Sequence, residues 1–247
     1  MKNLKCYGGW VPEIPDQRDY LYRAIKPVIR VPKKIDLREA CPEIEYQGKL
    51  GSCTAQALAG NLEFLDKKID GKYTDVSRLF IYYNERVLMD AVDSDSGASL
   101  RDGIKTLKND GACYESIWPY VISRFNKKPP QKCYDEAKAH RIESYHRLSA
   151  IPEMLTCLTE GYPFVFGFAV YESFESEQVE RTGIVRMPKK TEAQIGGHAV
   201  MAVGYDQAGK QFIVRNSWGK KWGMDGYFTM PFKYLDTLAG DFWTIRR

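Results

Sequence analysis

The sequence predicts an α+β protein in which a helical half is followed by a β-rich half. Apolar residues recur at helical spacing after residue 53, whereas strand-sized apolar runs dominate after residue 163. An irregular bridge, which contains the aromatic turn Trp118–Pro119–Tyr120 and the segment Asn126–Pro130, separates the two patterns. Because clefts between such halves are favoured places for ligands, we expect the functional site to lie between them.

Three helices are expected in the first half, each marked by apolar residues on one face and by a polar residue that can cap its first turn. A glycine ends the first and the third of these patterns. The expected positions are Ser52 or Cys53 to Gly71 for the first helix, Asp75 or Ser77 to Leu88 for the second, and Ser99 to Gly111 for the third.

The second half contains one expected helix and four expected strands. The helix covers Pro152–Thr159, capped by Ser149 and stopped by Gly161. The turn Asp206–Gly209 is expected to join two of the strands as a hairpin. The expected strands are Phe164–Val170, His198–Tyr205, Gln211–Asn216 and Tyr227–Met230.

The chain is expected to divide into an N-terminal arm at 1–30, a helical lobe at 31–140 and a β-rich lobe at 141–247. The arm carries several prolines together with Trp10, Tyr20 and Tyr22, which indicates an extended segment with aromatic anchors. We expect the arm to act as a permanent structural strap. The alternative is a short plug across the cleft.

Composition excludes several classes of function. The net charge of the 247 residues is only +4 and the basic residues are scattered, which argues against a nucleic-acid partner. No apolar run has the length of a membrane span, and no signal peptide is evident at the N-terminus. We therefore expect a cytoplasmic, monomeric protein without a membrane partner; a secreted or delivered effector is the alternative location.

The six cysteines show neither metal-ligand spacing nor a dense disulfide pattern. We expect reduced thiols, no metal and no organic cofactor. If disulfides form, Cys113 with Cys133 is the first pair to examine.

Cys53 lies where a glycine-bearing loop meets the first expected helix. The unpaired backbone N–H groups and the positive end of the peptide dipole favour an anion at this position, and a thiolate is such an anion. The alternative is a small buried apolar residue, the ordinary role of cysteine in a globular protein. The helix start by itself leaves these two interpretations about equal.

A cysteine nucleophile needs a base, and the base needs a group that holds its tautomer. His140 and His146 lie in a charged stretch typical of a protein surface. His198 instead follows two glycines and begins an apolar strand, and a hairpin from it places Asn216 within reach of the imidazole. A nearby tryptophan, Trp218 or Trp222, could shield that contact from water.

Three motifs are similar to the papain family of cysteine peptidases: QGKLGSCTA at Gln47–Ala55, GGHAVMAVGYD at Gly196–Asp206 and FIVRNSWGKKWGMDGYF at Phe212–Phe228. The similarity covers roughly 32–231. It implies a papain-like two-lobed fold, with a helical left lobe, an antiparallel β-barrel-like right lobe and the active site in the cleft between them.

The resemblance implies a role for each matched residue. Cys53 would be the nucleophile, His198 its proton partner and Asn216 the residue that orients His198. The Gln47 side-chain amide and the Cys53 backbone N–H would stabilise the oxyanion. The family holds its cysteine and histidine as a thiolate–imidazolium pair, and the implied reaction is hydrolysis of a peptide or protein substrate through a thioester.

The chain also departs from the family pattern. Thr54 replaces a tryptophan, and Leu50 stands where many members have a disulfide cysteine, whose partner the loop 93–99 lacks. The glycine pair that commonly binds the substrate backbone is expected to be replaced by Ala98 and Ser99. Small walls at Gly167 and Gly196 imply a pocket that tolerates bulky apolar side chains. The residues expected to contact substrate are Ala98, Ser99, Gly167, Gly196, Gly197 and Trp218.

Fold and triad do not specify the acceptor of the acyl group. A deamidase, an isopeptidase or an acyl transferase on the same triad is the principal alternative to a peptidase. A non-catalytic peptide-binding protein that keeps the cleft is a further alternative, which the full set of Cys53, His198, Asn216 and Gln47 disfavours.

Overall fold

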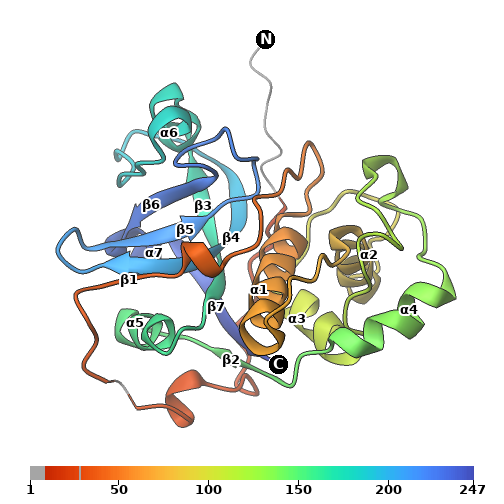
Figure 1. Ribbon diagram of the computed structural model, residues 1–247. Helices are drawn as coiled ribbons and strands as arrows, with labels where there is room; N and C mark the ends of the chain where they lie inside the picture. Colours follow the sequence, from red (N-terminus) through yellow and green to blue (C-terminus); the bar gives the residue numbers. More distant parts are fainter. Residues whose placement is uncertain (1–8, 28) are drawn as a thin grey trace.

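The computed structural model describes residues 9–27 and 29–247 and has a helical side and a sheet side (Figure 1). Helix α1 lies between the two sides. The combination of helices with an antiparallel sheet confirms the α+β fold class. Residues 1–8 of the expected arm, including Cys6, lie outside the described residues.

The helical half follows the expected order. Gly71, in a left-handed conformation, ends α1, and the hydroxyls of Ser77 and Ser99 accept hydrogen bonds from the first turns of α2 and α3. The helices are α1 (Cys53–Asp70), α2 (Arg78–Leu88), α3 (Leu100–Asn109), α4 (Gln131–Ala137), α5 (Ile151–Thr159), α6 (Glu177–Thr182) and α7 (Phe232–Leu238).

Two of the expected caps are wrong. Ser52 precedes α1 but makes no side-chain cap; its hydroxyl lies 2.5 Å from the hydroxyl of Tyr120 instead. Ala150, not Ser149, is the N-cap of α5. The backbone N–H of Ser149 donates to Glu153 in the first turn of that helix, so a contact from inside the helix replaces the expected serine cap.

The β-rich half forms an antiparallel sheet that pairs in the order β2-β7-β3-β4-β5-β6, with β1 also paired to β4. The two ends of this order are not joined, so the barrel-like expectation is corrected to an open sheet. Strands β2 and β7 were not expected, whereas β1 lies in the segment 32–45, for which a short strand or a turn was expected. The strands are β1 (Lys34–Asp36), β2 (Ser144–Arg147), β3 (Phe164–Tyr171), β4 (Gln194–Asp206), β5 (Gln211–Arg215), β6 (Tyr227–Pro231) and β7 (Ala239–Arg246).

The expected hairpin joins β4 to β5. Asp206 pairs with Gln211 across the turn, and its carboxylate accepts a hydrogen bond from the Ala208 N–H at 2.9 Å. This register places the two strands side by side, with the start of β4 extending beyond the end of β5. Asn216 follows β5 directly and therefore lies near the middle of β4.

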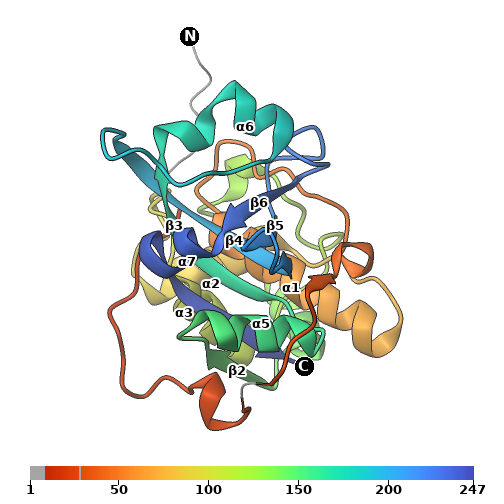
Figure 2. The same ribbon diagram turned by 90° about the vertical axis from the view of Figure 1, so that its left-hand side faces the viewer.

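The two faces of the sheet are covered by different helices. Figure 2 shows α5 and α7 on the face opposite α1. On that face, aromatic residues fill the space between sheet and helices; Phe164, Phe166 and Phe212 are fully buried. The other face of β4 packs against α1, and the core beneath this contact joins the two halves of the molecule.

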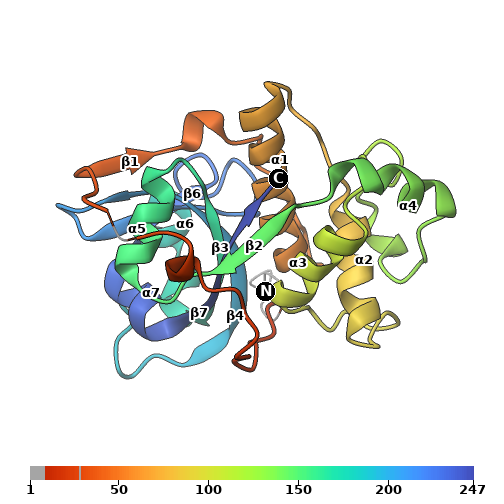
Figure 3. The same ribbon diagram turned by 90° about the horizontal axis from the view of Figure 1, so that it is seen from below.

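The described part of the arm wraps around the molecule and passes beneath the sheet close to α5 (Figure 3). Asp19 pairs with Arg101 of α3 at 2.8 Å and with Arg147 of β2 at 2.7 Å. The Tyr22 hydroxyl donates to Glu160 at the end of α5 at 2.7 Å. These contacts bind both halves together, as a strap does.

Cys41, Cys113, Cys133 and Cys157 carry free thiols, as expected. Within 9–27 and 29–247, no group of three or more histidine, cysteine or acidic side chains is placed to hold a metal ion. No helix of the described chain combines the length and the apolar character that crossing a membrane requires.

The pairing of β1 with β4 depends on a small residue at position 204. A Cβ atom added to Gly204 would lie 2.4 Å from the Ile35 carbonyl oxygen and 3.1 Å from the Asp36 Cα. Gly204→Ala is therefore expected to destabilise the fold by about 1–3 kcal/mol, because backbone atoms must move. Urea unfolding would measure this loss. Gly240→Ala is the matched control, since nothing lies within 4 Å of the added Cβ; equal losses would contradict the prediction.

Candidate active site

Cys53 is the first residue of α1 and is 1% exposed. The loop before it is short, and Gln47, Leu50 and Ser52 within it are buried. The N-terminus of a helix presents unpaired backbone N–H groups, which favour negative charge next to the thiol. The position expected for the nucleophile therefore has the electrostatic character that thiolate chemistry needs.

His198 lies on β4 and is held by Asn216. The Nε2 atom of His198 lies 2.8 Å from the Asn216 Oδ1, which also accepts the Ser217 backbone N–H at 2.8 Å. Because a backbone N–H can only donate, the oxygen of the amide must face it, and Nε2 must carry the hydrogen. The other ring nitrogen, Nδ1, has no hydrogen-bond partner among the described residues. It is the nitrogen left to accept a proton.

The His198–Asn216 contact is enclosed by aromatic rings. Trp218 stacks on the imidazole with ring centroids 4.9 Å apart and an interplanar angle of 29°. Phe168 contacts the same ring edge-to-face at 5.8 Å. Burial lowers the pKa of His198 to about 4, although the bond to Asn216 acts in the opposite direction. Burial in this conformation therefore disfavours the imidazolium that the resemblance implies.

Gln47 is positioned from two sides. Its Nε2 donates to the Leu50 carbonyl at 3.0 Å, and its Oε1 accepts the Ser217 hydroxyl at 2.6 Å. The second hydrogen of Nε2 remains for another acceptor. Ser217 was not identified from the sequence. Its position next to Asn216 was the available signal, but its contact with Gln47 spans 170 residues.

Tyr120 was expected only as part of a turn, yet it supports the same loop. Its hydroxyl donates to the Gln47 carbonyl at 3.0 Å and also contacts the Ser52 hydroxyl. The irregular bridge between the two halves thus holds the segment between Gln47 and Cys53.

The arm lies across the site. Ala98 N–H donates to the Gly9 carbonyl at 2.8 Å, and the Val11 N–H donates to the Ala98 carbonyl at 2.9 Å. A Cβ added to Gly9 would lie 2.8 Å from the Cys53 sulfur. The arm therefore combines features of both expected alternatives. Residues 9–11 cover the thiol, as a plug would, and later residues fasten the arm to the body, as a strap would.

Trp10 fills a slot with two glycine walls. A Cβ added to Gly167 would lie 1.9 Å from the indole, and one added to Gly197 would lie 2.8 Å from it. The indole Nε1 donates to Asp241 at 3.0 Å. Gly196, also expected in this pocket, precedes Gly197 on β4 and pairs with Val170. Trp10 was identified in the sequence as an aromatic anchor, but no neighbouring residue in the sequence indicated that it would occupy this slot.

Ser99 has another role in this structure. Its hydroxyl contacts Asp102 at 2.8 Å and accepts the Asp102 N–H at 3.1 Å, as the cap of α3. Of the expected backbone-binding pair, only Ala98 bonds to the arm through both its N–H and its carbonyl.

A buried charge cluster anchors the arm beyond Trp10. The Glu13 carboxylate accepts the Trp243 indole N–H at 3.2 Å and lies 3.4 Å from Arg101 and 3.7 Å from Arg147. The Glu13 N–H donates to Asp241 at 3.0 Å. Burial, and then the neighbouring Asp241 charge, raise the pKa of Glu13 to about 7. The docked arm therefore favours a protonated Glu13.

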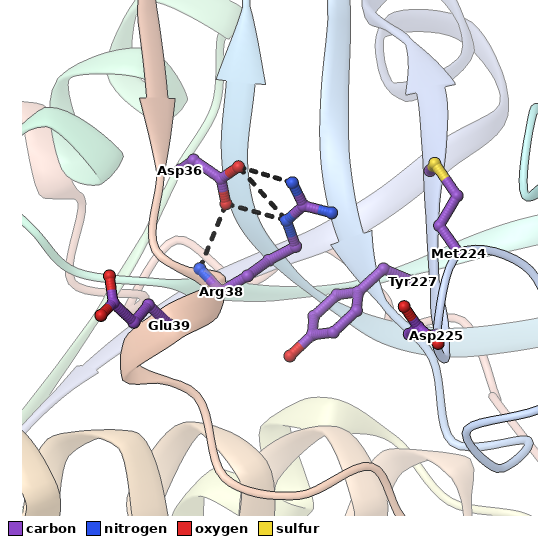
Figure 4. Close-up of a pocket in the computed structure, with 6 residues that line it drawn as sticks. All are labelled: Asp36, Arg38, Glu39, Met224, Asp225 and Tyr227. Carbon is purple, nitrogen blue, oxygen red and sulfur yellow. Dashed lines mark hydrogen bonds and ion pairs between the residues drawn. The ribbon is translucent and has the colours of Figure 1, made fainter.

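A separate surface pocket lies away from these residues (Figure 4). It is lined by Asp36, Arg38, Glu39, Met224, Asp225 and Tyr227. Asp36 and Arg38 are already paired with each other, at 2.9 and 2.7 Å, and the pocket contains neither a thiol nor an imidazole. The residues that line this pocket therefore supply no thiol nucleophile.

Comparisons with known proteins agree with the geometry. A model of the papain family cysteine proteases matches residues 31–235. An uncharacterized peptidase C1-like protein of Acanthamoeba polyphaga mimivirus is 45% identical, over 96% of this chain and 86% of its own length. A cathepsin L-like proteinase of Fasciola hepatica is 30% identical, over 81% of this chain and 60% of its own.

The structural comparison gives the same family. The crystal structure of xylellain, a cysteine protease from Xylella fastidiosa, matches 100% of this chain with 98% of its own, at a TM-score of 0.91 and 41% identity. A digestive procathepsin L2 of Tenebrio molitor, 22% identical with a TM-score of 0.76, shares the fold. The resemblance seen in the three sequence motifs is confirmed, and the chain belongs to the papain family of cysteine proteases.

Proposed function

We propose that the chain hydrolyses peptide bonds through Cys53, His198 and Asn216, with a thioester intermediate. The observation that carries the proposal is the hydrogen bond from His198 to Asn216, which leaves Nδ1 as the only proton acceptor of the ring. His198 lies on β4, and α1, which begins with Cys53, packs on that strand.

The steps follow from these groups. Nδ1 of His198 takes the thiol proton, and the Cys53 sulfur attacks the peptide carbonyl carbon. The carbonyl oxygen becomes an oxyanion, for which Gln47 Nε2 and the Cys53 N–H are the donors. The C–N bond then breaks as His198 returns the proton to the leaving amine. Water, deprotonated by His198, hydrolyses the thioester and regenerates the thiol.

The docked arm indicates what the cleft accepts. Main-chain groups on both sides of Trp10 bond to Ala98, and the indole fills the slot between Gly167 and Gly197. A substrate strand is therefore expected to use Ala98 for its backbone and to place a bulky side chain in the slot. The Gly9 carbonyl is taken up by Ala98 and not by Gln47, which explains why the arm itself is not held for attack.

We infer that the same arm keeps the enzyme at rest. It covers the thiol and fills the slot beside β4, the strand on which the buried His198 has its pKa lowered to about 4. A neutral imidazole disfavours the ion pair with the thiolate. Displacement of residues 9–11 would readmit water and substrate together.

Cleavage of a proteome-derived peptide library tests the function. The wild type is expected to produce new termini, with bulky apolar residues enriched two positions before the cut, because the slot accommodates an indole. Cys53→Ala should produce none. A strict requirement for a small or charged residue at that position would contradict the pocket. If both proteins are silent although the wild-type thiol labels rapidly, the result favours deamidation or acyl transfer.

Trp10→Ala is expected to raise peptidase activity and the rate of Cys53 labelling by iodoacetamide at least ~10-fold, because burial of the indole is the largest apolar contact of residues 9–11. Ile14→Ala is the matched control, since this arm side chain is 84% exposed. If the variant becomes insoluble and its remaining soluble fraction labels at the wild-type rate, the result would instead support a purely structural strap.

Glu13→Gln tests the charge cluster. Because the docked pKa is raised from 4.5 to about 7, the contribution of Glu13 to docking is complete below pH ~4.5 and is lost as the pH rises through ~7. At pH 8 the variant should dock more tightly and label several-fold more slowly at Cys53 than the wild type. At pH 4.5 the two rates should agree.

Comparison of the two proteins at one pH cancels the titration of the thiol itself. Glu172→Gln, an exposed glutamate, is the control substitution. Faster labelling of Glu13→Gln at pH 8 would contradict the prediction, because it would mean that pairing with Arg101 and Arg147 outweighs the cost of burying the carboxylate.

A further inference from the structure

The peptide bond between Leu50 and Gly51 is held on both sides. Its carbonyl accepts the Gln47 Nε2 at 3.0 Å. Its N–H donates to the two carboxylate oxygens of Asp95, at 3.0 and 3.1 Å. A peptide unit is planar, so a rotation that moves one of these groups also moves the other.

Asp95 is itself fixed by neighbours outside the loop. The hydroxyl of Tyr82, a fully buried residue of α2, donates to the same carboxylate. That hydroxyl also accepts the Gly97 N–H at 3.2 Å. The Arg86 guanidinium lies 4.1 Å from the centre of the Tyr82 ring. The carboxylate thus connects a rigid helix to the loop before the nucleophile.

The opposite end of the Gln47 amide is already taken. The Ser217 hydroxyl holds Oε1 at 2.6 Å and the Leu50 carbonyl accepts one hydrogen of Nε2, so these two contacts together set the direction of the second hydrogen. If that carbonyl turned away, Nε2 would lose the partner that aims its second hydrogen. The room for Asp95 is also specific, because a Cβ on Gly51 would lie 2.9 Å from the Asp95 Oδ1.

We propose that Asp95 is a positioning residue for the oxyanion hole, acting through the Leu50–Gly51 peptide on the side-chain amide of Gln47. The proposal rests on the peptidase function proposed above. It gives the loop 93–99 a role that a disulfide has in many family members: where Leu50 replaces the cysteine of the loop, a charge-assisted hydrogen bond from the next residue forms the tie.

Asp95→Ala should lower kcat for peptide cleavage about 10-fold with little change in KM, because a misdirected donor retains part of the stabilisation, whereas removal of an oxyanion donor costs ~10²–10³. Alkylation of Cys53 by iodoacetamide forms no oxyanion, so its rate should stay within about twofold of the wild type. Asp95→Asn keeps an acceptor for the Gly51 N–H and should recover part of the loss. Asp93→Ala, which removes an exposed charge from the same loop, is the matched control.

The relay itself is tested in the Gln47→Ala background. If Asp95 acts through Gln47, Asp95→Ala should cost less than about twofold there, since the group that it positions is gone. A full 10-fold loss in both backgrounds would overturn the proposal, as would a parallel loss of alkylation, which would indicate a collapsed loop.

The test remains available if the wild type cleaves no peptide. If the thiol still labels rapidly, the absence of cleavage would count against the proposed peptidase function and not against the role of Asp95. A peptide aldehyde adds reversibly to the thiol and places its oxygen in the same hole, so its affinity can replace kcat in the comparison. The proposal is supported if the aldehyde binds Asp95→Ala about 10-fold more weakly than the wild type and if this difference disappears in the Gln47→Ala background. Equal affinity of Asp95→Ala and the wild type overturns it.

Discussion

The contact between α1 and β4 is the constraint on which the rest of the structure depends. One element carries Cys53 and the other carries His198, so the chemistry requires that a helix end and a strand pack in one register. Every residue of α1 from Cys53 to Asp66 is buried, which leaves the helix little freedom to rotate or slide. The two halves therefore hold the proposed nucleophile and the proposed base at a common interface.

Local patterns could predict the elements that meet there. Helical spacing located α1, spacing together with serine caps located α2 and α3, and glycines around His198 indicated a strand that opens into a site. The hairpin turn at Asp206–Gly209 was enough to predict that Asn216 lies near the imidazole. These features depend on residues close together in the sequence, for which periodicity and turn chemistry are informative.

The supporting contacts could not be predicted in this way. Ser217 reaches Gln47 across 170 residues, and Trp10 reaches Asp241 across 231. The short strand β2 pairs only with β7, and β7 in turn lies between β2 and β3, so these pairings follow from the completed sheet. In the loop 93–99, Asp95 has the same local sequence signals as any exposed acid. Its role arises only from the packing of Tyr82 and Gly51 around it.

Residues 9–11 can cover the thiol without a high intrinsic affinity for the site. The arm is part of the same chain, so residues 9–11 compete with a substrate at a high effective concentration, and modest intrinsic affinity is enough. Two backbone hydrogen bonds to Ala98 and one partly buried indole supply that affinity. The strap formed by Asp19 and Tyr22 keeps the tether short even when Trp10 leaves its slot. The contacts that cover the thiol and those that hold the two halves together meet at one charge cluster, because Asp241, the partner of the Trp10 indole, also pairs with Arg147 at 3.3 Å.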